Sequence, residues 1–190
     1  IVTKKLLTFY IETARQKVLG ILFKYPEKEF SLSDIAKEAG VAKAHIGKIL
    51  DEFYSLGLIT LEKLTKIWRI KANRQNPEYI KNKIVYNLGF IYHSGLVEFL
   101  NEEFNNPKAI ILFGSFRKGD DISTSDIDIA IESDDAKGYQ VVMHKKLAEF
   151  EREIGRKIQI HLFSRKNIDL NVFNNIANGI VLSGFLEVKP

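Results

Sequence analysis

The sequence predicts a mixed α/β (α+β) protein in two parts, and three observations lead to this expectation. Residues 1–75 show apolar side chains at helical spacing and then two short strand patterns. Residues 76–190 hold strand patterns that alternate with helical segments, which is typical of a small mixed sheet. The first part has 14 Lys/Arg against 8 Asp/Glu and the second has 14 against 16, so the net charges are +6 and −2. Such asymmetry indicates a module that faces a polyanion, joined to a chemically different domain.

The composition is that of a globular protein. Hydrophobic residues make up 45% of the 190 residues and charged residues 27%, which allows a sizeable core. No apolar stretch approaches the roughly 20 residues that a membrane span needs, and the first residues lack a signal-peptide pattern. The absence of cysteine excludes disulfides, thiolate zinc sites and cysteine nucleophiles. We therefore expect a cytoplasmic protein with no membrane contact.

Helical patterns dominate the N-terminal part. Apolar residues from Ala14 to Phe23 recur at helical spacing and predict a first helix. The stretch FSLSDIAKEAG predicts a second helix, capped by Ser33 and stopped by Gly40. The stretch VAKAHIGKILDEFYSLGLI predicts a third helix, with an apolar stripe along one side. Two short strands are then predicted over Leu58–Glu62 and Lys66–Ile70.

This order of elements, over about residues 11–72, resembles the winged helix-turn-helix of bacterial and archaeal transcription regulators. The resemblance implies that the third helix enters the major groove of duplex DNA and that hairpin cations contact phosphates. There are two alternative interpretations. The charged faces of the helix and hairpin are simply solvated, or this part of the chain is a module for protein contacts. The expected DNA-binding residues are Lys43, His45 and Lys48 on the helix, and Lys63, Lys66 and Arg69 on the hairpin.

A break at Asn76-Pro77 is expected to start a long linker helix over residues 77–105. Its apolar residues fall on several faces, so the helix needs more than one packing partner. We expect it either to lie between domains or to form a surface for a homodimer. The predicted domains are therefore a DNA-binding domain at residues 1–75 and a second domain at residues 76–190, which includes this helix.

A strand, a glycine turn and a second strand are predicted next. The stretch AIILFGS is typical of a buried strand that enters a tight turn, and DIDIAIES alternates between two faces. Asp126 and Asp128 therefore point the same way. Carboxylates held side by side repel unless a cation lies between them, and Mg²⁺ prefers oxygen ligands. The alternative interpretation is that the strand lies at the edge of the sheet and that both carboxylates are simply solvated.

Ten residues separate the letters GS at position 114 from the letters DID at position 126. In this strand context, the pattern resembles the minimal nucleotidyltransferases of the DNA polymerase β superfamily. The resemblance implies transfer of a nucleoside monophosphate from a Mg²⁺-bound nucleoside triphosphate, such as ATP, to an acceptor hydroxyl, with release of pyrophosphate. The implied nucleotide-binding residues are Gly114, Ser115 and Lys118, and the implied catalytic and Mg²⁺-binding residues are Asp126 and Asp128.

The remaining segments agree in outline with that resemblance. The stretch AKGYQVVMHKKLAEFEREIG predicts a helix, and KIQIHLF predicts a further strand. The stretch VFNNIANGIVLSGFLEV resembles the closing helix and terminal turn of minimal nucleotidyltransferases.

One strand departs from the family pattern. Active members bring a third carboxylate from the strand after the helix, but here that face carries Gln159 and His161. Glutamine cannot accept a proton at neutral pH, so His161 or an acid from elsewhere would have to act as the base. An active enzyme, a weakened enzyme, and a domain that binds nucleotide without turnover all remain open.

Three functions are compatible with these features. The first is a nucleotidyltransferase with a DNA-binding domain; because family members are antitoxin partners of small helical toxins, a toxin protein is one implied acceptor. The second is a transcription regulator whose C-terminal domain is inactive and senses nucleotide or mediates dimerisation. The third is a pair of modules for protein contacts.

Overall fold

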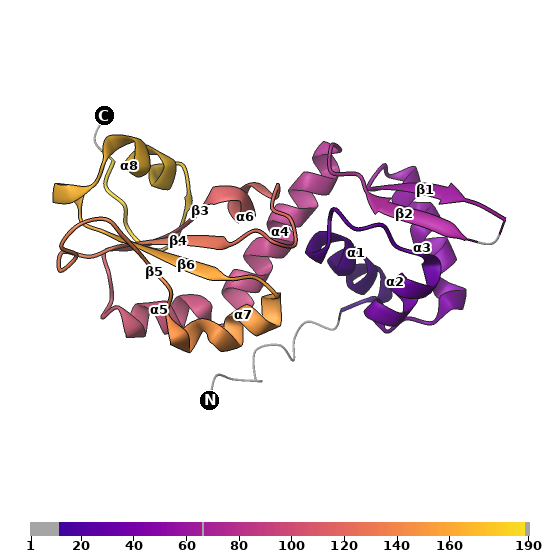
Figure 1. Cartoon of the computed structure of the whole chain (residues 1–190), viewed down its shortest axis with the longest axis horizontal. Helices are drawn as coiled ribbons and strands as arrows, with labels where there is room; N and C mark the ends of the chain where they lie inside the picture. The colour runs from indigo at the N-terminus through magenta and orange to yellow at the C-terminus, as the bar shows by residue number, and fades with distance from the viewer. Residues whose placement is uncertain (1–11, 66, 189–190) are drawn as a thin grey trace. The chain divides into compact units, whose positions relative to one another are not determined.

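The computed structural model describes residues 12–65 and 67–188, which divide into two compact units (Figure 1). The boundary lies between Tyr86 and Asn87, inside helix α4 (Pro77–His93), whereas the sequence places it near residue 75. Within the described residues, no helix combines the length and apolar character that crossing a bilayer requires. Each unit has its own buried core.

The first unit contains helices α1 to α3, a β1–β2 hairpin and the first part of α4 (Figure 1). The two strands pair antiparallel, with Lys63 opposite Trp68. Each strand begins one or two residues later than the sequence predicts. The bounds are α1 Ala14–Lys24, α2 Leu32–Ala39, α3 Lys43–Ser55, β1 Ile59–Lys63 and β2 Trp68–Ala72.

Helix α2 begins earlier than predicted, because its N-cap is Ser31 and not Ser33. The Asp34 N–H donates to Ser31 Oγ at 3.2 Å, and the Ser31 N–H donates to Asp34 Oδ2 at 3.1 Å. These reciprocal bonds form a capping box, which requires a partner three residues after the cap. The predicted stop is confirmed, since Gly40 adopts φ +61 and closes the helix.

The core of the first unit is built by the apolar stripes of its helices. The predicted buried face of α3 is confirmed, and Tyr79 of α4 is 1% exposed in the same core. The Tyr79 hydroxyl donates to the carbonyl oxygen of Leu22 at 2.8 Å, so this buried phenol is satisfied. The buried residues of α3 are Ile46, Ile49, Leu50 and Phe53.

Within the described residues, the second unit contains a five-stranded mixed sheet in the order β5-β6-β4-β3-β7. Strands β4 and β6 are parallel, and the other neighbours are antiparallel. Figure 1 shows α8 on one face of the sheet and α5 and α7 on the other. The bounds are α5 Leu96–Glu103, β3 Ala109–Phe113, α6 Gly114–Lys118, β4 Ile127–Glu132, β5 Gln140–Val142, α7 Ala148–Ile154, β6 Ile158–Phe163, α8 Leu170–Ala177 and β7 Ile180–Gly184.

Strand β4 separates the two cores of this unit because its side chains alternate. Ile127, Ile129 and Ile131 pack against α5 and α7, whereas Ala130 packs with residues of α8. Asp128 lies on the same face of the strand as Ala130. The face that carries the acid pair is therefore the face that α8 partly covers.

The predicted linker helix over residues 77–105 is interrupted. Helix α4 ends at His93, and α5 begins at Leu96 after Gly95, which has φ +78. That left-handed conformation is incompatible with a continuous α-helix and is readily adopted by glycine.

The predicted helix over residues 136–155 is also only partly present. Its first half forms β5 and the 3₁₀ turn η2 (Lys145–Leu147), and α7 covers only the second half. Val141 pairs with His161 of β6, so this β-branched segment completes the sheet edge. In the same way, the letters IVLSG lie in the stretch expected to form a closing helix and a terminal turn, but they form strand β7, which pairs with β3.

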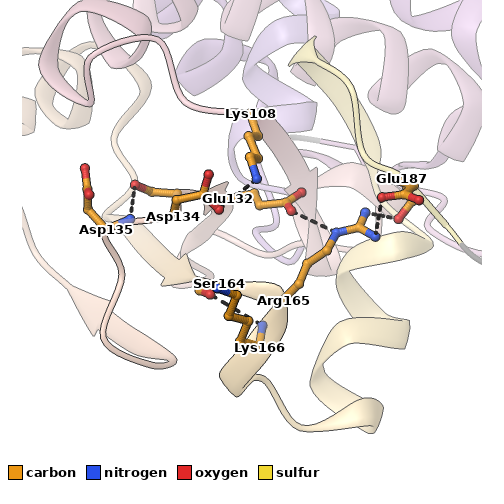
Figure 2. A network of polar contacts seen from close by, with 9 residues as sticks. Lys108, Glu132, Asp134, Asp135, Ser164, Arg165, Lys166 and Glu187 are labelled. Atoms are coloured by element: carbon orange, nitrogen blue, oxygen red, sulfur yellow. Dashed lines mark hydrogen bonds and ion pairs between the residues drawn. The ribbon is translucent and has the colours of Figure 1, made fainter.

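Arg165 ties together the segments at the C-terminal end of β4 (Figure 2). Its Nε donates to Glu132 Oε1 at 2.8 Å, and its two Nη atoms donate to the side chain and the carbonyl oxygen of Glu187. Glu132 is 4% exposed, so a buried carboxylate has a fixed cation here. Nearby, Lys108 Nζ lies 2.7 Å from Asp134 Oδ1 at the surface.

Candidate functional site

The turn after β3 lies directly against the acid on β4. Phe113, the last residue of β3, is paired with Asp128. Gly114 follows with φ +73, and a Cβ atom at this position would lie 2.2 Å from Asp128 Oδ2. Both the backbone conformation and the lack of space therefore require glycine. As a result, the turn backbone and the Asp128 carboxylate are in contact.

Helix α6 places the other predicted phosphate-binding residues. Phe116 is 1% exposed and anchors the helix, while Lys118 is exposed. The Arg117 guanidinium donates to the carbonyl oxygen of Asn178. Among the described residues, neither Lys118 nor Arg117 takes part in an ion pair, so both add positive charge beside the turn. Ser115 is half-buried in the first turn of α6.

A tight loop before β4 positions Asp126 near the Gly114 turn. The Ile122 N–H donates to Ser125 Oγ at 2.9 Å, and the Ser125 N–H donates back to the Ile122 carbonyl oxygen at 3.0 Å. Asp126 follows this loop and immediately precedes β4. The structure therefore brings Gly114, Asp126 and Asp128 together around the start of β4, as the sequence predicts.

Two polar side chains of β6, Gln159 and His161, contact the two acids. Gln159 pairs with Asp128 across the parallel strands, and its Nε2 donates to Asp126 Oδ2. His161 Nε2 lies 3.1 Å from Asp128 Oδ1. The prediction that these two residues face the acid pair is confirmed, and β6 contributes no carboxylate there. His161 is only 7% exposed, so solvent does not surround the imidazole.

The hydrogen-bond chemistry assigns the proton of His161 Nε2. A carboxylate can only accept, so Nε2 must carry the proton that reaches Asp128. In this arrangement Nε2 cannot serve as the base of an incoming hydroxyl, and only Nδ1 has a free electron pair. The role of His161 toward Asp128 is therefore that of a donor that orients a carboxylate.

The acid pair has the donor chemistry of a Mg²⁺ site that is completed by a substrate. In the described part of the chain, no Lys or Arg forms an ion pair with Asp126 or Asp128, and one oxygen of each carboxylate has no hydrogen-bond partner. Those two oxygens fit Mg²⁺, which usually takes one or two carboxylates together with substrate phosphates and water. No group of three or more His, Asp or Glu that could hold a metal occurs among the described residues. The phosphates would therefore be part of the site.

Tyr139 is a member of this cluster that the sequence does not reveal. Its hydroxyl lies 2.6 Å from His161 Nδ1, and the ring of Phe113 packs at 4.8 Å from the imidazole. Burial, followed by the negative charge of Asp128, raises the pKa of the Tyr139 hydroxyl. Because the segment around Tyr139 reads as a helix, no local signal places its side chain next to β6.

A groove of about 460 Å³ opens beside Asp126. Its size is within the range of ligand pockets, so a substrate has room next to Asp126, whereas Asp128 and the Gly114 turn do not line this groove. The lining comes from the loop before β4, from α7 and from the segment before β6: Ser123, Thr124, Ser125, Asp126, Ala148, Glu151, Arg152, Gly155, Arg156 and Lys157.

Residues 95–184 match the family model described as Polymerase beta, Nucleotidyltransferase. The matched segment contains the turn at Gly114, the acid pair and strand β6. The match supports membership of this segment in the nucleotidyltransferase superfamily and a nucleotidyltransferase-like function with a nucleotide substrate. No curated protein and no solved structure matches the chain.

Outside the nucleotidyltransferase-like segment, α3 presents the predicted DNA-binding side chains of the helix to solvent. Lys43, His45 and Lys48 are all exposed, and within the described residues none of them takes part in an ion pair. Buried Ile46 and Leu50 hold the opposite side of the helix in the core. This face of α3 is therefore an unneutralised positive surface.

The hairpin cations differ from those of α3. Lys63 Nζ lies 2.6 Å from Asp51 Oδ1, and Arg69 contacts Glu29 at 2.8 Å and Glu62 at 3.3 Å. These acids neutralise the charges that the sequence assigns to phosphate contacts. The third predicted hairpin residue, Lys66, lies outside the described residues.

Proposed function

We propose that residues 95–184 transfer a nucleoside monophosphate from a Mg²⁺-bound nucleoside triphosphate to an acceptor hydroxyl and release pyrophosphate. The contact between Gly114 and Asp128 is the observation that supports this function most directly. It sets the backbone of a glycine turn against a carboxylate that, among the described residues, has no Lys or Arg partner. A triphosphate and its metal need those two features side by side.

Each residue of the site has its own role in the proposed transfer reaction. The backbone N–H groups of Gly114 and Ser115 bind the outer phosphates, and the Lys118 ammonium adds a positive charge. Asp126 and Asp128 hold Mg²⁺, which when bound neutralises charge that develops on the leaving pyrophosphate. Gln159 and His161 orient the two carboxylates through hydrogen bonds, so the acids do not have to reorganise when the substrate arrives.

Calorimetric titration with ATP, GTP, CTP and UTP, with and without Mg²⁺, tests this proposal. We expect Mg²⁺-dependent binding of at least one triphosphate, and a loss of about 100-fold or more in Asp126→Asn/Asp128→Asn. The variant Asp134→Asn is the matched control, because Asp134 is an exposed acid near the other end of β4. Equal affinity of the native chain and the double variant would reject the site. Pyrophosphate release on addition of an acceptor, a partner protein among them, then tests turnover.

We also propose that α3 binds duplex DNA. The supporting observation is that Lys43 and Lys48 are exposed without neutralising acids, in contrast to Lys63 and Arg69 on the hairpin. A helix that presents cations and small residues to a groove can combine phosphate contacts with base contacts. On this proposal the helix supplies most of the affinity and the hairpin supplies little.

Fluorescence anisotropy of labelled duplexes at several salt concentrations tests DNA binding. Replacing Lys48 by Ala is expected to weaken binding to all sequences and to reduce the slope of log K against log salt by about 1. The same substitution at Lys166, an exposed lysine of the second unit, is the control. If Arg69→Ala reduces the slope as much as Lys48→Ala, the hairpin shares the interface and the proposed division is wrong.

A regulator that binds nucleotide without turnover is the second candidate function. It is favoured by Gln159 and His161, which are not acids, at the place where a third acid is expected. This candidate predicts Mg²⁺-dependent triphosphate binding that changes the DNA affinity while no pyrophosphate is released. Measurement of both quantities on one preparation separates it from the enzyme.

A further inference from the structure

A chain of three side chains crosses neighbouring strands at the site. The Tyr139 hydroxyl lies 2.6 Å from His161 Nδ1, and His161 Nε2 lies 3.1 Å from Asp128 Oδ1. A hydroxyl within hydrogen-bond reach of a base, which is itself oriented by a third group, is the structural signature of an activated nucleophile. The proposed transfer reaction requires a hydroxyl nucleophile, and here the chain itself provides one.

The proton positions agree with this interpretation. Asp128 accepts the Nε2 proton of His161, so the free electron pair of the imidazole is on Nδ1 and points at the phenol. The Tyr139 hydroxyl therefore donates to Nδ1. Burial, and then the charge of Asp128, raise the pKa of this hydroxyl, so it retains its proton at neutral pH and needs a base when it attacks.

The order of the strands places the Tyr139 hydroxyl on the side from which an in-line attack on the triphosphate would come. Across the sheet the order is β5-β6-β4-β3, which corresponds to Tyr139, His161, Asp128 and Gly114. The turn proposed to hold the outer phosphates and the phenol therefore lie on opposite sides of Asp128. An in-line displacement at phosphorus needs this arrangement, because the nucleophile enters opposite the leaving pyrophosphate.

We propose that Tyr139 is an acceptor of the transferred nucleotide, so that the chain modifies itself. This inference rests on the proposed transferase function. The Tyr139 oxygen forms a bond to the α-phosphorus of the nucleoside triphosphate, and the bond from that phosphorus to the bridging oxygen breaks. Pyrophosphate leaves with the electron pair, and the phenolic proton moves to His161 Nδ1. The product is a phosphodiester between Tyr139 and the nucleoside.

Tyr139 is accessible enough for this role. It is 38% exposed and precedes the edge strand β5, so a nucleotide on its oxygen need not be buried in the core. Other nearby hydroxyls are less suited. Ser115 lies on the phosphate side of the acid pair, and Ser125 Oγ accepts a hydrogen bond from its own loop.

Mass spectrometry of the full chain, incubated with Mg²⁺ and each of ATP, GTP, CTP and UTP, tests the proposal. We expect the mass of one nucleoside monophosphate on the peptide that contains Tyr139, and none on that peptide in Asp128→Asn. The variant Tyr139→Phe should lose the label, whereas Tyr92→Phe should keep it, since Tyr92 is an exposed tyrosine of α4 with 46% exposure. His161→Gln should lower the rate of labelling about 100-fold, because glutamine can donate to Asp128 but cannot accept the proton.

Calorimetry on the same preparations separates the two proposals. Tyr139→Phe keeps the ring and loses only the hydroxyl, so it should bind the Mg²⁺-bound triphosphate as the native chain does. Binding by the native chain without a label on Tyr139, or an equal label in Tyr139→Phe, overturns self-modification and leaves the nucleotide site intact. Absence of triphosphate binding overturns both proposals together.

Discussion

The two ends of strand β4 show opposite ways of holding an acid. At the C-terminal end, Glu132 is 4% exposed and bonded to the Arg165 guanidinium. At the N-terminal end, Asp126 and Asp128 are hydrogen-bonded to Gln159 and His161, and neither of these side chains carries a permanent charge. The acids at one end therefore have a permanent cation, whereas those at the other do not.

This difference separates a structural acid from a functional pair. A buried carboxylate that is matched by an arginine holds segments together, and its charge is already compensated without a metal. A pair of carboxylates with neutral partners retains its mutual repulsion, which a divalent cation would remove. The missing positive charge is thus the physical reason to place the metal at the N-terminal end of β4.

The largest expected effect concerns the permanent cation. Arg165→Ala should lower the free energy of unfolding by about 3 kcal/mol, because the buried Glu132 carboxylate loses its ion-pair partner. Urea unfolding followed by circular dichroism measures this loss. Lys108→Ala, which breaks an exposed pair with Asp134, should cost less than about 1 kcal/mol. Equal costs for the two variants would contradict a special role for the buried acid.

Gly114→Ala should have the next largest effect, at the other end of the strand. We expect a loss of about 2 kcal/mol from the left-handed conformation and from displacement of the Asp128 carboxylate. Thermal unfolding and calorimetry measure stability and triphosphate binding, and binding should disappear. Gly40→Ala is the control, since it has φ +61 but nothing within 4 Å of the added carbon. Retained triphosphate binding in Gly114→Ala would argue against the contact with Asp128 as part of the site.

Asp126→Asn should have a smaller effect of opposite sign. Without Mg²⁺, removal of one charge of the pair should stabilise the chain by about 0.5 kcal/mol, while Gln159 still finds an oxygen acceptor. Addition of Mg²⁺ and ATP should raise the melting temperature of the native chain and leave that of the variant unchanged. A variant that is less stable than the native chain without metal would show that the pair is not repulsive.

The smallest effect on stability is expected at Glu29 of the first unit. This surface acid is paired with Arg69 and Lys71. Hydrogen bonds from Arg69, and then Lys71, lower its pKa from 4.5 to about 2. Because the pKa is depressed in the folded chain, the stabilisation is present above about pH 4.5 and is lost as the pH falls towards about 2. Titration by NMR should give this low midpoint, and Arg69→Ala should raise it. An unchanged midpoint in that variant would mean that the ion pair does not form in solution.

The sequence by itself determined the three helices and the hairpin of the first unit, the strands on either side of the Gly114 turn, and the place of the acid pair. Apolar periodicity identified the stripe of α3, and the period of two in β4 placed Asp126 and Asp128 on one face. These patterns are readable because they depend only on residues that are close in the chain. The same local patterns were misleading where pairing partners are distant, as in β5 and β7, which read as a helix and a turn.

Only the tertiary structure decided which side chains complete the site and which charges are neutralised. Tyr139 meets His161 because β5 pairs with β6, and His161 meets Asp128 because β6 runs parallel to β4. Likewise, Arg69 is paired by acids far from it in the sequence, such as Glu29. Such contacts depend on strand order and register across long separations, and hydrogen bonds and ion pairs form only between atoms that the fold brings within a few ångströms.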